Sequence, residues 1–273
     1  MPKQHGSSTR NHRQAPYVPR QSQREREGTR ANLADGEGFG PTDSQRGDMY
    51  DLGFNVVKRN RVDATRIAMQ AHEEPPDDKT IVLFTDASLP GGQGIRVIGG
   101  IAVVRVLPSD ADQSATASAG ESEQNPGQAP DKFRLDGVTG EEFTIEDRLE
   151  DGPLRHRQLE VEELELVAML RGFEYAVSEV EIRELGDLTT SHLLLWSDCF
   201  GGLNTLRLFR AGDSAWQDHP SAWVLRQILE CARKLRDCGV YVKCQWVPGH
   251  SNIPGNEEAD RIAKAAAAGK PWK

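Results

Sequence analysis

The 273-residue chain has few aromatic residues, few cysteines and no long apolar run. Aromatic side chains make up 6% of it, and its four cysteines (Cys199, Cys231, Cys238 and Cys244) form no Cys-x-x-Cys pair. We therefore expect reduced, packed thiols rather than a zinc site or a disulfide framework. Because no apolar run approaches the ~18 to 20 residues of a membrane span and no secretory signal is visible, we expect an intracellular protein without a membrane partner. Its expected compartment is the nucleus or the cytoplasm rather than the mitochondrion, since Pro16 and Pro19 disfavour an amphipathic transit helix.

Positive charge is also scarce, because 42 acidic residues face 33 lysines and arginines and leave a formal net charge of −9. The acidity is concentrated in residues 141–187, where 15 acidic and 5 basic residues give a balance of −10. The first 34 residues instead carry seven lysines and arginines against two glutamates, a balance of +5. This basic arm is compatible with contact to nucleic acid and equally with a solvated tail.

Composition divides the chain into a polar N-terminal region and one folded domain. Residues 1–76 are rich in polar and charged residues, so we expect them to be disordered, except that Tyr50–Met69 has enough apolar positions for a short docking element. Residues 77–269 are expected to form the domain, with a disordered insertion at 108–132 and a tail at 270–273. The insertion is assigned from its Ser, Ala, Asp, Gln, Gly and Pro content.

Apolar runs and helical periodicity predict the elements of this domain. Strands are expected at 80–84, 97–107, 141–145, 192–198 and 240–247, and helices at 159–180, 201–209, 221–237 and 256–268. The first two strands read as a hairpin, and the order of elements predicts an α/β fold with a mixed five-stranded sheet and helices on both faces.

Four carboxylates stand at informative places in this pattern. Asp86 and Asp198 each follow an apolar strand, Glu165 precedes the inner stripe of the long helix, and Asp260 lies on the last helix. An aspartate at one strand end is common in turns, so neither strand-end aspartate alone indicates function. If the four converge, their charges repel one another and favour Mg²⁺, which prefers hard oxygen ligands. Two such ions ~4 Å apart are suited to phosphodiester cleavage.

Four motifs in this order resemble those of the type 1 ribonuclease H family. They are Phe84-Thr-Asp-Ala-Ser88, Glu165-Leu-Val-Ala168, Trp196-Ser-Asp-Cys199 and Trp246-Val-Pro-Gly-His250-Ser-Asn-Ile-Pro-Gly-Asn256-Glu-Glu-Ala-Asp260. The last is the most specific, because the family has a Trp-Val-x-Gly-His loop followed by Asn-x-x-x-Asp at the start of a helix.

The resemblance implies a ribonuclease H-like fold and an endonuclease that hydrolyses the RNA strand of RNA/DNA hybrids, acting as a monomer. It implies two Mg²⁺ ions, with Mn²⁺ as a substitute, held by Asp86, Glu165, Asp198 and Asp260. Asp86 would bridge both ions, and Glu165 and Asp198 would bind the ion beside the nucleophilic water. Asp260 would hold the ion near the scissile phosphate, and His250 would assist proton transfer or product release. Asn256 would support the loop and the helix start.

The sequence departs from the family where substrate is bound. It lacks a strongly basic, Trp-rich protrusion after the helix that follows Asp198, so the basic arm or a partner would have to supply affinity. Glu162 and Glu163 compete with Glu165 as ligands, although only Glu165 has the Leu-x-Ala context. The main alternative is an inactive or weakly active nucleic-acid-binding module of retroelement origin, and another is a DNA-cutting integrase or resolvase of the same superfold. The four carboxylates and His250 disfavour the first, and the Trp-Val-x-Gly-His loop disfavours the second.

Overall fold

The computed structural model describes residues 54–74, 76–90, 98–108, 133–144, 160–186, 188–209 and 214–273. The N-terminal residues 1–53 and the insertion predicted at 108–132, apart from Pro108, lie outside these ranges. Within them, no helix is long and apolar enough to span a membrane. All four cysteines are free thiols, and Cys244 is buried as expected of a packed thiol, whereas Cys238 is exposed.

A six-stranded mixed sheet in the order β1-β6-β5-β2-β3-β4 organises the domain. Its strands are β1 (Phe54–Val57), β2 (Thr80–Ser88), β3 (Ile98–Pro108), β4 (Phe133–Thr144), β5 (His192–Ser197) and β6 (Tyr241–Trp246). The four strands β1, β6, β5 and β2 run parallel, whereas β3 is antiparallel to both β2 and β4. The predicted α/β class and the hairpin are therefore confirmed, with one strand more than expected.

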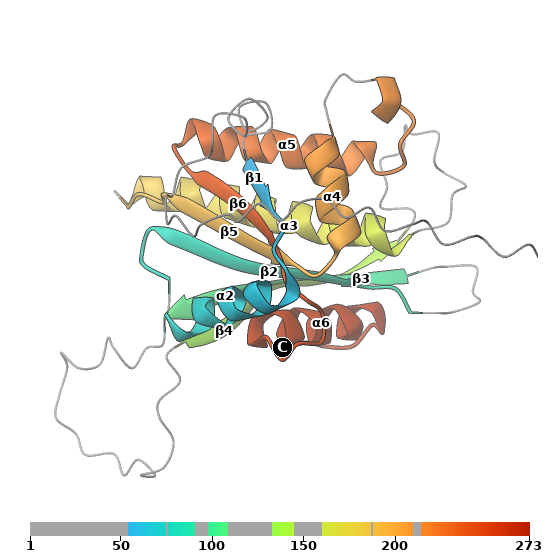
Figure 1. The fold of residues 1–273 in the computed structure, drawn as a ribbon, viewed down its shortest axis with the longest axis horizontal. Coiled ribbons are helices and arrows are strands. Elements are labelled where there is room, and N and C mark those ends of the chain that lie inside the picture. The colour runs from blue at the N-terminus through green and yellow to red at the C-terminus, as the bar shows by residue number, and fades with distance from the viewer. Residues whose placement is uncertain are drawn as a thin grey trace, which may run out of the picture. The chain divides into compact units, whose positions relative to one another are not determined.

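Helices cover both faces of the sheet, as predicted (Figure 1). One face carries α3 (Val161–Leu185) and α5 (Ala222–Asp237), whose apolar stripes pack on Ile81, Leu83, Leu193 and Leu195. The other face carries α2 (Arg61–Glu73) and α6 (Pro254–Ala267), which pack over Phe84, Val104 and Trp196. The remaining helices are α4 (Phe200–Leu208) and the short 3₁₀ helix Ser214–Trp216. The long apolar stripe of α3 explains why it lies centrally, since a helix buried along its length needs apolar residues on most sides.

The expectation that residues 54–74 are disordered was wrong, because they form β1 and α2. Strand β1 pairs in parallel with β6, with Val56 opposite Cys244. In α2 the buried residues are Ala64, Ala68 and His72, spaced four residues apart. Two alanines and a histidine make a weak hydrophobic stripe, so the periodicity that reveals most helices is faint here. The docking element considered for Tyr50–Met69 agrees with part of this segment.

The third strand was predicted too short, since β4 begins at Phe133 rather than at Glu141. Glycines made its first part look like a loop. A Cβ atom on Gly137 or Gly140 would lie 2.5 Å from the indole of Trp272 and less than 3 Å from Ile262. These glycines therefore admit α6 and the C-terminal segment onto the strand. Trp272 belongs to the predicted tail, yet it packs on the sheet.

Candidate functional site

The first two acidic residues meet because two parallel strands end at the same edge of the sheet. Strand β5 pairs with β2 so that Ser197 lies opposite Thr85. The next residues along the two strands are Asp198, which directly follows β5, and Asp86, which is still in β2 opposite Ala102 of β3, and they therefore lie side by side. Strand β6 runs parallel to β5, with Trp246 opposite Ser197, and the loop that carries His250 follows it at the same edge. The carboxyl ends of parallel strands are where ligands gather in open α/β sheets.

Helix α3 brings Glu165 to this edge. One carboxylate oxygen from each of Asp86, Glu165 and Asp198 lies within 4.8 Å of the other two. Asp86 and Glu165 are each only 5% exposed. One oxygen of Asp86 accepts a hydrogen bond from the backbone N–H of Ala87 at 2.9 Å, whereas Oε2 of Glu165 is buried with no hydrogen-bond partner. A buried carboxylate oxygen without a donor is costly and indicates that another group satisfies it in the functional state.

The rival glutamates on α3 point to other partners. Glu163 is buried and accepts a hydrogen bond from the indole N–H of Trp223 at 3.1 Å. Glu162 is exposed and accepts one from the hydroxyl of Thr205 at 2.7 Å. Neither belongs to the carboxylate group of Asp86, so the geometry selects Glu165 among the three.

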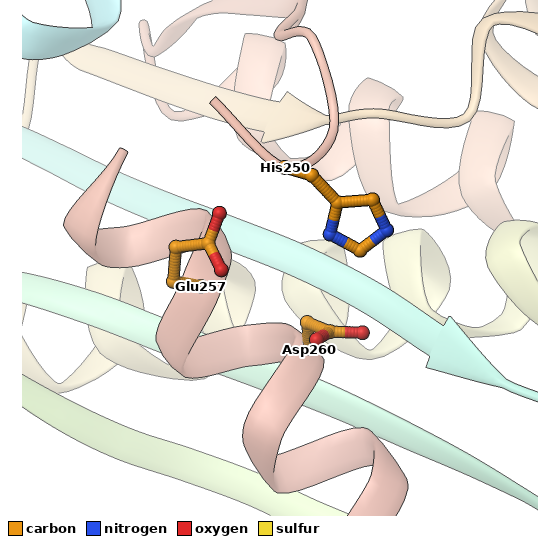
Figure 2. A group of neighbouring side chains, drawn as sticks. All are labelled: His250, Glu257 and Asp260. Carbon is orange, nitrogen blue, oxygen red and sulfur yellow. The ribbon is translucent and has the colours of Figure 1, made fainter. Parts of the chain in front are cut away.

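Asp260 belongs to a second group of possible metal ligands. A single site built from all four predicted carboxylates would need Asp260 within 4.8 Å of Asp86, Glu165 and Asp198 together, and the structure does not place it so. The ligand atoms of Asp260 come within 4.8 Å of those of His250 and Glu257. Figure 2 shows Glu257 and Asp260 on successive turns of α6, with the imidazole of His250 above Asp260 and beside Glu257. The carboxylate of Asp260 also forms an ion pair with Lys264, whose Nζ lies 2.6 Å away. Sequence reasoning missed Glu257, although its i, i+3 spacing from Asp260 places both on one face of the helix.

Asp198 is contacted by the end of β6, by the loop that follows it and by the first turn of α6. The indole N–H of Trp246 donates to the backbone carbonyl of Asp198 at 3.0 Å, and the amide of Asn256 donates to its carboxylate at 3.3 Å. The backbone of Gly249 passes so close that a Cβ atom there would lie 2.6 Å from the carboxylate. The predicted supporting role of Asn256 agrees with its burial and with this contact.

The loop itself is conformationally strained at two positions. His250 and Asn252 have φ angles of 51° and 56°, in the left-handed region that non-glycine residues seldom adopt. Such strain persists only where surrounding contacts hold it, and it is concentrated at functional sites. His250 is exposed at the surface of the site.

Burial and mutual repulsion make the carboxylates reluctant to ionise. Burial raises the pKa of Asp86 to about 8, and the negative charges of Asp198 and Asp260 act in the same direction. Burial also raises the pKa of Glu165, with repulsion from Asp86 and Asp198 adding to it. The pKa of Asp198 is raised by burial, against the lowering effect of the Asn256 hydrogen bond. Groups with such shifts and a shared surface are candidates for a functional site, and a cation would relieve all of them together.

These features define an α/β domain with a partly buried acidic centre at the carboxyl edge of its parallel strands. Residues 163–268 match the family model described as RNase H. The matched segment contains Glu165, Asp198, His250 and Asp260, while Asp86 precedes it. Residues 163–268 thus match the RNase H family, which confirms the resemblance seen in the motifs of this segment.

Several solved structures are similar to the chain. RNase H1 from the halophilic archaeon Halobacterium salinarum NRC-1 has 16% identity and a TM-score of 0.36, covering 70% of this chain and 98% of that one. LC11-RNase H1, isolated from compost by a metagenomic approach, has 11% identity and a TM-score of 0.38, with coverages of 70% and 97%. The native prototype foamy virus protease-reverse transcriptase has 13% identity and a TM-score of 0.44, and the match covers 72% of this chain and 22% of the viral chain. No curated protein matches the sequence.

Proposed function

We propose that this protein is an endonuclease that hydrolyses the RNA strand of RNA/DNA hybrids with two Mg²⁺ ions. The observation that carries the proposal is the acidic centre, in which Asp86, Glu165 and Asp198 meet beside Asp260 in a domain that matches the RNase H family. A surface meant only to bind nucleic acid gains nothing from clustered negative charge near phosphates. The acidic centre therefore favours an enzyme over a passive binding module.

The residues present fit divalent cations. The donors are carboxylate oxygens, which are the ligands that Mg²⁺ and Mn²⁺ prefer. The unpartnered Oε2 of Glu165 and the raised pKa of Asp86 both indicate that a positive charge belongs among these groups. Asp86, Glu165, Asp198 and Asp260 would hold the ions, with Glu257 as a further donor beside Asp260. Such ions, when bound, supply an activated water and stabilise the charge on the leaving oxygen.

The chain itself would position the reacting groups and move a proton. Trp246, Asn256 and Gly249 hold Asp198 in place, so its carboxylate needs little reorganisation when substrate binds. The exposed imidazole of His250 lies beside Glu257 and Asp260, where it could take a proton from water or give one to the leaving group.

The test is cleavage of an RNA/DNA hybrid labelled on the RNA strand, with Mg²⁺, against duplex DNA and duplex RNA. Wild-type protein is expected to cut only the RNA of the hybrid, and Mn²⁺ is expected to replace Mg²⁺. Glu165→Gln should reduce cleavage by at least about 100-fold, whereas Glu162→Gln, the same change one turn earlier on α3, should keep it. Circular dichroism and thermal unfolding check that both variants are folded. Cleavage that survives Glu165→Gln, or a purified protein that cuts duplex DNA instead, would overturn the proposal.

A further inference from the structure

Three basic side chains follow β1, two of them before α2 and one at its first residue, in a segment that precedes the RNase H match. They are Lys58, Arg59 and Arg61, and we call them the basic linker. Strand β1 runs parallel to β6 and β5, so the linker leaves the sheet at the same edge as Asp86 and Asp198. In a chain with a net charge of −9, three cations beside the acidic centre are unusual.

Lys58 is connected to the site through two aromatic rings. Its Nζ lies 4.2 Å from the centre of the Phe200 ring, an arrangement in which the ring's negative face attracts the cation. Phe200 begins α4, two residues after Asp198, and is 40% exposed. Its ring meets that of Trp246 edge-on, with centroids 6.3 Å apart, and Trp246 in turn donates to the Asp198 carbonyl. The ammonium group is thus held near the surface beside Asp198.

Arg61 reaches the loop on the other side of the site. Its guanidinium donates to the hydroxyl of Ser251 at 3.2 Å, and Ser251 directly follows His250. Arg61 is exposed, so the donors that do not face Ser251 are open to solvent. Lys58 therefore contacts a residue two positions after Asp198, and Arg61 contacts the residue that follows His250.

Arg59 has no anionic partner among the residues that the structure describes. Its Nε is buried and has no hydrogen-bond acceptor. The pKa of the neighbouring Lys243 on β6 is lowered, first by the burial of Lys243 and then by the positive charge of Arg59. Among the described residues, none of the three linker cations forms a salt bridge. A group of Lys and Arg side chains that is not paired with carboxylates can bind an anion from another molecule, such as a phosphate.

We propose that the basic linker is a binding site for the sugar–phosphate backbone of the substrate, next to the acidic centre. This inference rests on the proposed function, because it takes the RNA/DNA hybrid as the nucleic acid. The cations would attract phosphates flanking the scissile one and offset the repulsion of the carboxylates. Contacts to phosphates carry no sequence information, so the linker raises affinity for any hybrid sequence.

The test compares wild-type protein with the triple variant Lys58→Gln/Arg59→Gln/Arg61→Gln. The matched control is Lys79→Gln/Lys270→Gln/Lys273→Gln, which removes three exposed charges elsewhere. Lys79 precedes β2 at the opposite edge of the sheet, and the other two follow the end of α6. Steady-state cleavage gives KM and kcat, and fluorescence anisotropy with a labelled hybrid at several salt concentrations gives the slope of log K against log salt.

The linker variant is expected to raise KM by about tenfold or more, with kcat within about twofold of wild type. Its salt slope should be smaller in magnitude by about 2 to 3, since each lost phosphate contact removes about one unit. The control should change neither value. If wild type cuts the hybrid and the linker variant keeps the KM and salt slope of the control, the linker site is refuted while the proposed function stands.

If wild type does not cut the hybrid at all, the proposed function fails, and the anisotropy measurement alone decides the linker. A smaller slope in the linker variant than in the control would then support a backbone-binding site. Equal slopes would refute it. Thermal unfolding of all three proteins checks that loss of binding does not come from loss of folding.

Discussion

Replacing Asp86 with asparagine is expected to stabilise the metal-free protein while it removes the proposed cleavage activity. The buried Asp86 carboxylate lies against Glu165 and Asp198, and its environment raises its pKa from the usual 3.8 to about 8. In the unfolded chain the same group returns to its usual pKa. Between about pH 4 and pH 8 Asp86 therefore binds fewer protons in the unfolded state than in the folded state, so its contribution to the free energy of unfolding falls as pH rises.

The size of the effect follows from the pKa shift. A shift of about four units corresponds to about 6 kcal/mol for an isolated group, at about 1.4 kcal/mol per unit. Asp86 shares its repulsion with Glu165 and Asp198, so removal of one charge also eases ionisation of the other two. We therefore expect Asp86→Asn to raise the free energy of unfolding by about 2 to 3 kcal/mol at pH 8, and by close to zero at pH 4.

The assay is urea unfolding in EDTA at pH 4, 6 and 8, repeated at pH 8 with Mg²⁺. Asp78→Asn, at an exposed aspartate, is the control and should follow wild type. Mg²⁺ at about 100 times its dissociation constant should stabilise wild type by about 2.7 kcal/mol and Asp86→Asn by much less. A variant that is less stable than wild type at pH 8 in EDTA, or a difference that does not change with pH, would refute this account of the acidic centre.

Two further changes test how the site is supported. His72 is buried and accepts a hydrogen bond from the N–H of Gly255, and burial lowers its pKa. The contribution of His72 to stability should therefore fall as pH drops below about 6.5, by up to about 1.4 kcal/mol per unit. In urea unfolding, the stability of His72→Asn relative to wild type should rise by this slope as pH drops, whereas that of the exposed His192→Asn should stay constant. Gly249→Ala would put a Cβ atom 2.6 Å from the Asp198 carboxylate, so hybrid cleavage should fall by about 100-fold with a small change in Tm, and normal cleavage would show that the loop is not held against Asp198.

The sequence predicted the strands that carry Asp86 and Asp198 because both are buried on two faces. Such strands read as continuous apolar runs, and the residue that ends each run is then evident. The last helix and Asp260 were predicted from a different signal, the sequence motif around His250. The choice of Glu165 over Glu162 and Glu163 could be supported by its Leu-x-Ala context, but the partners of the other two needed three-dimensional contacts.

The first two elements could not be predicted, because their stabilising contacts lie far away in sequence. Strand β1 has four residues and is defined by pairing with β6, which follows it by nearly 190 positions. Helix α2 buries two alanines and His72, and His72 gains its acceptor role only from Gly255 on α6. A local pattern cannot report a hydrogen bond or a strand partner at that distance.

The domain boundary at β1 gives a last prediction. A chain that starts at residue 79 lacks β1 and α2, so β6 becomes an exposed sheet edge and the Phe84 ring loses its contact with His72. We expect it to lose about 3 kcal/mol or more of stability, or to aggregate, because an unpaired edge and uncovered apolar surface both favour association. The loss should extend to cleavage, because this chain lacks both the basic linker and His72, which accepts a hydrogen bond from Gly255 on α6, the helix that carries Asp260.

The matched comparison is a chain that starts at residue 51 and keeps β1, the basic linker and α2. Its Tm and its cleavage of the hybrid are expected to equal those of the full chain. Differential scanning calorimetry and the hybrid assay on the two truncated chains separate the possibilities. If the chain from residue 79 were as stable and as active as the chain from residue 51, β1 and α2 would be an appendage rather than part of the domain, and the supporting role of His72 would be wrong.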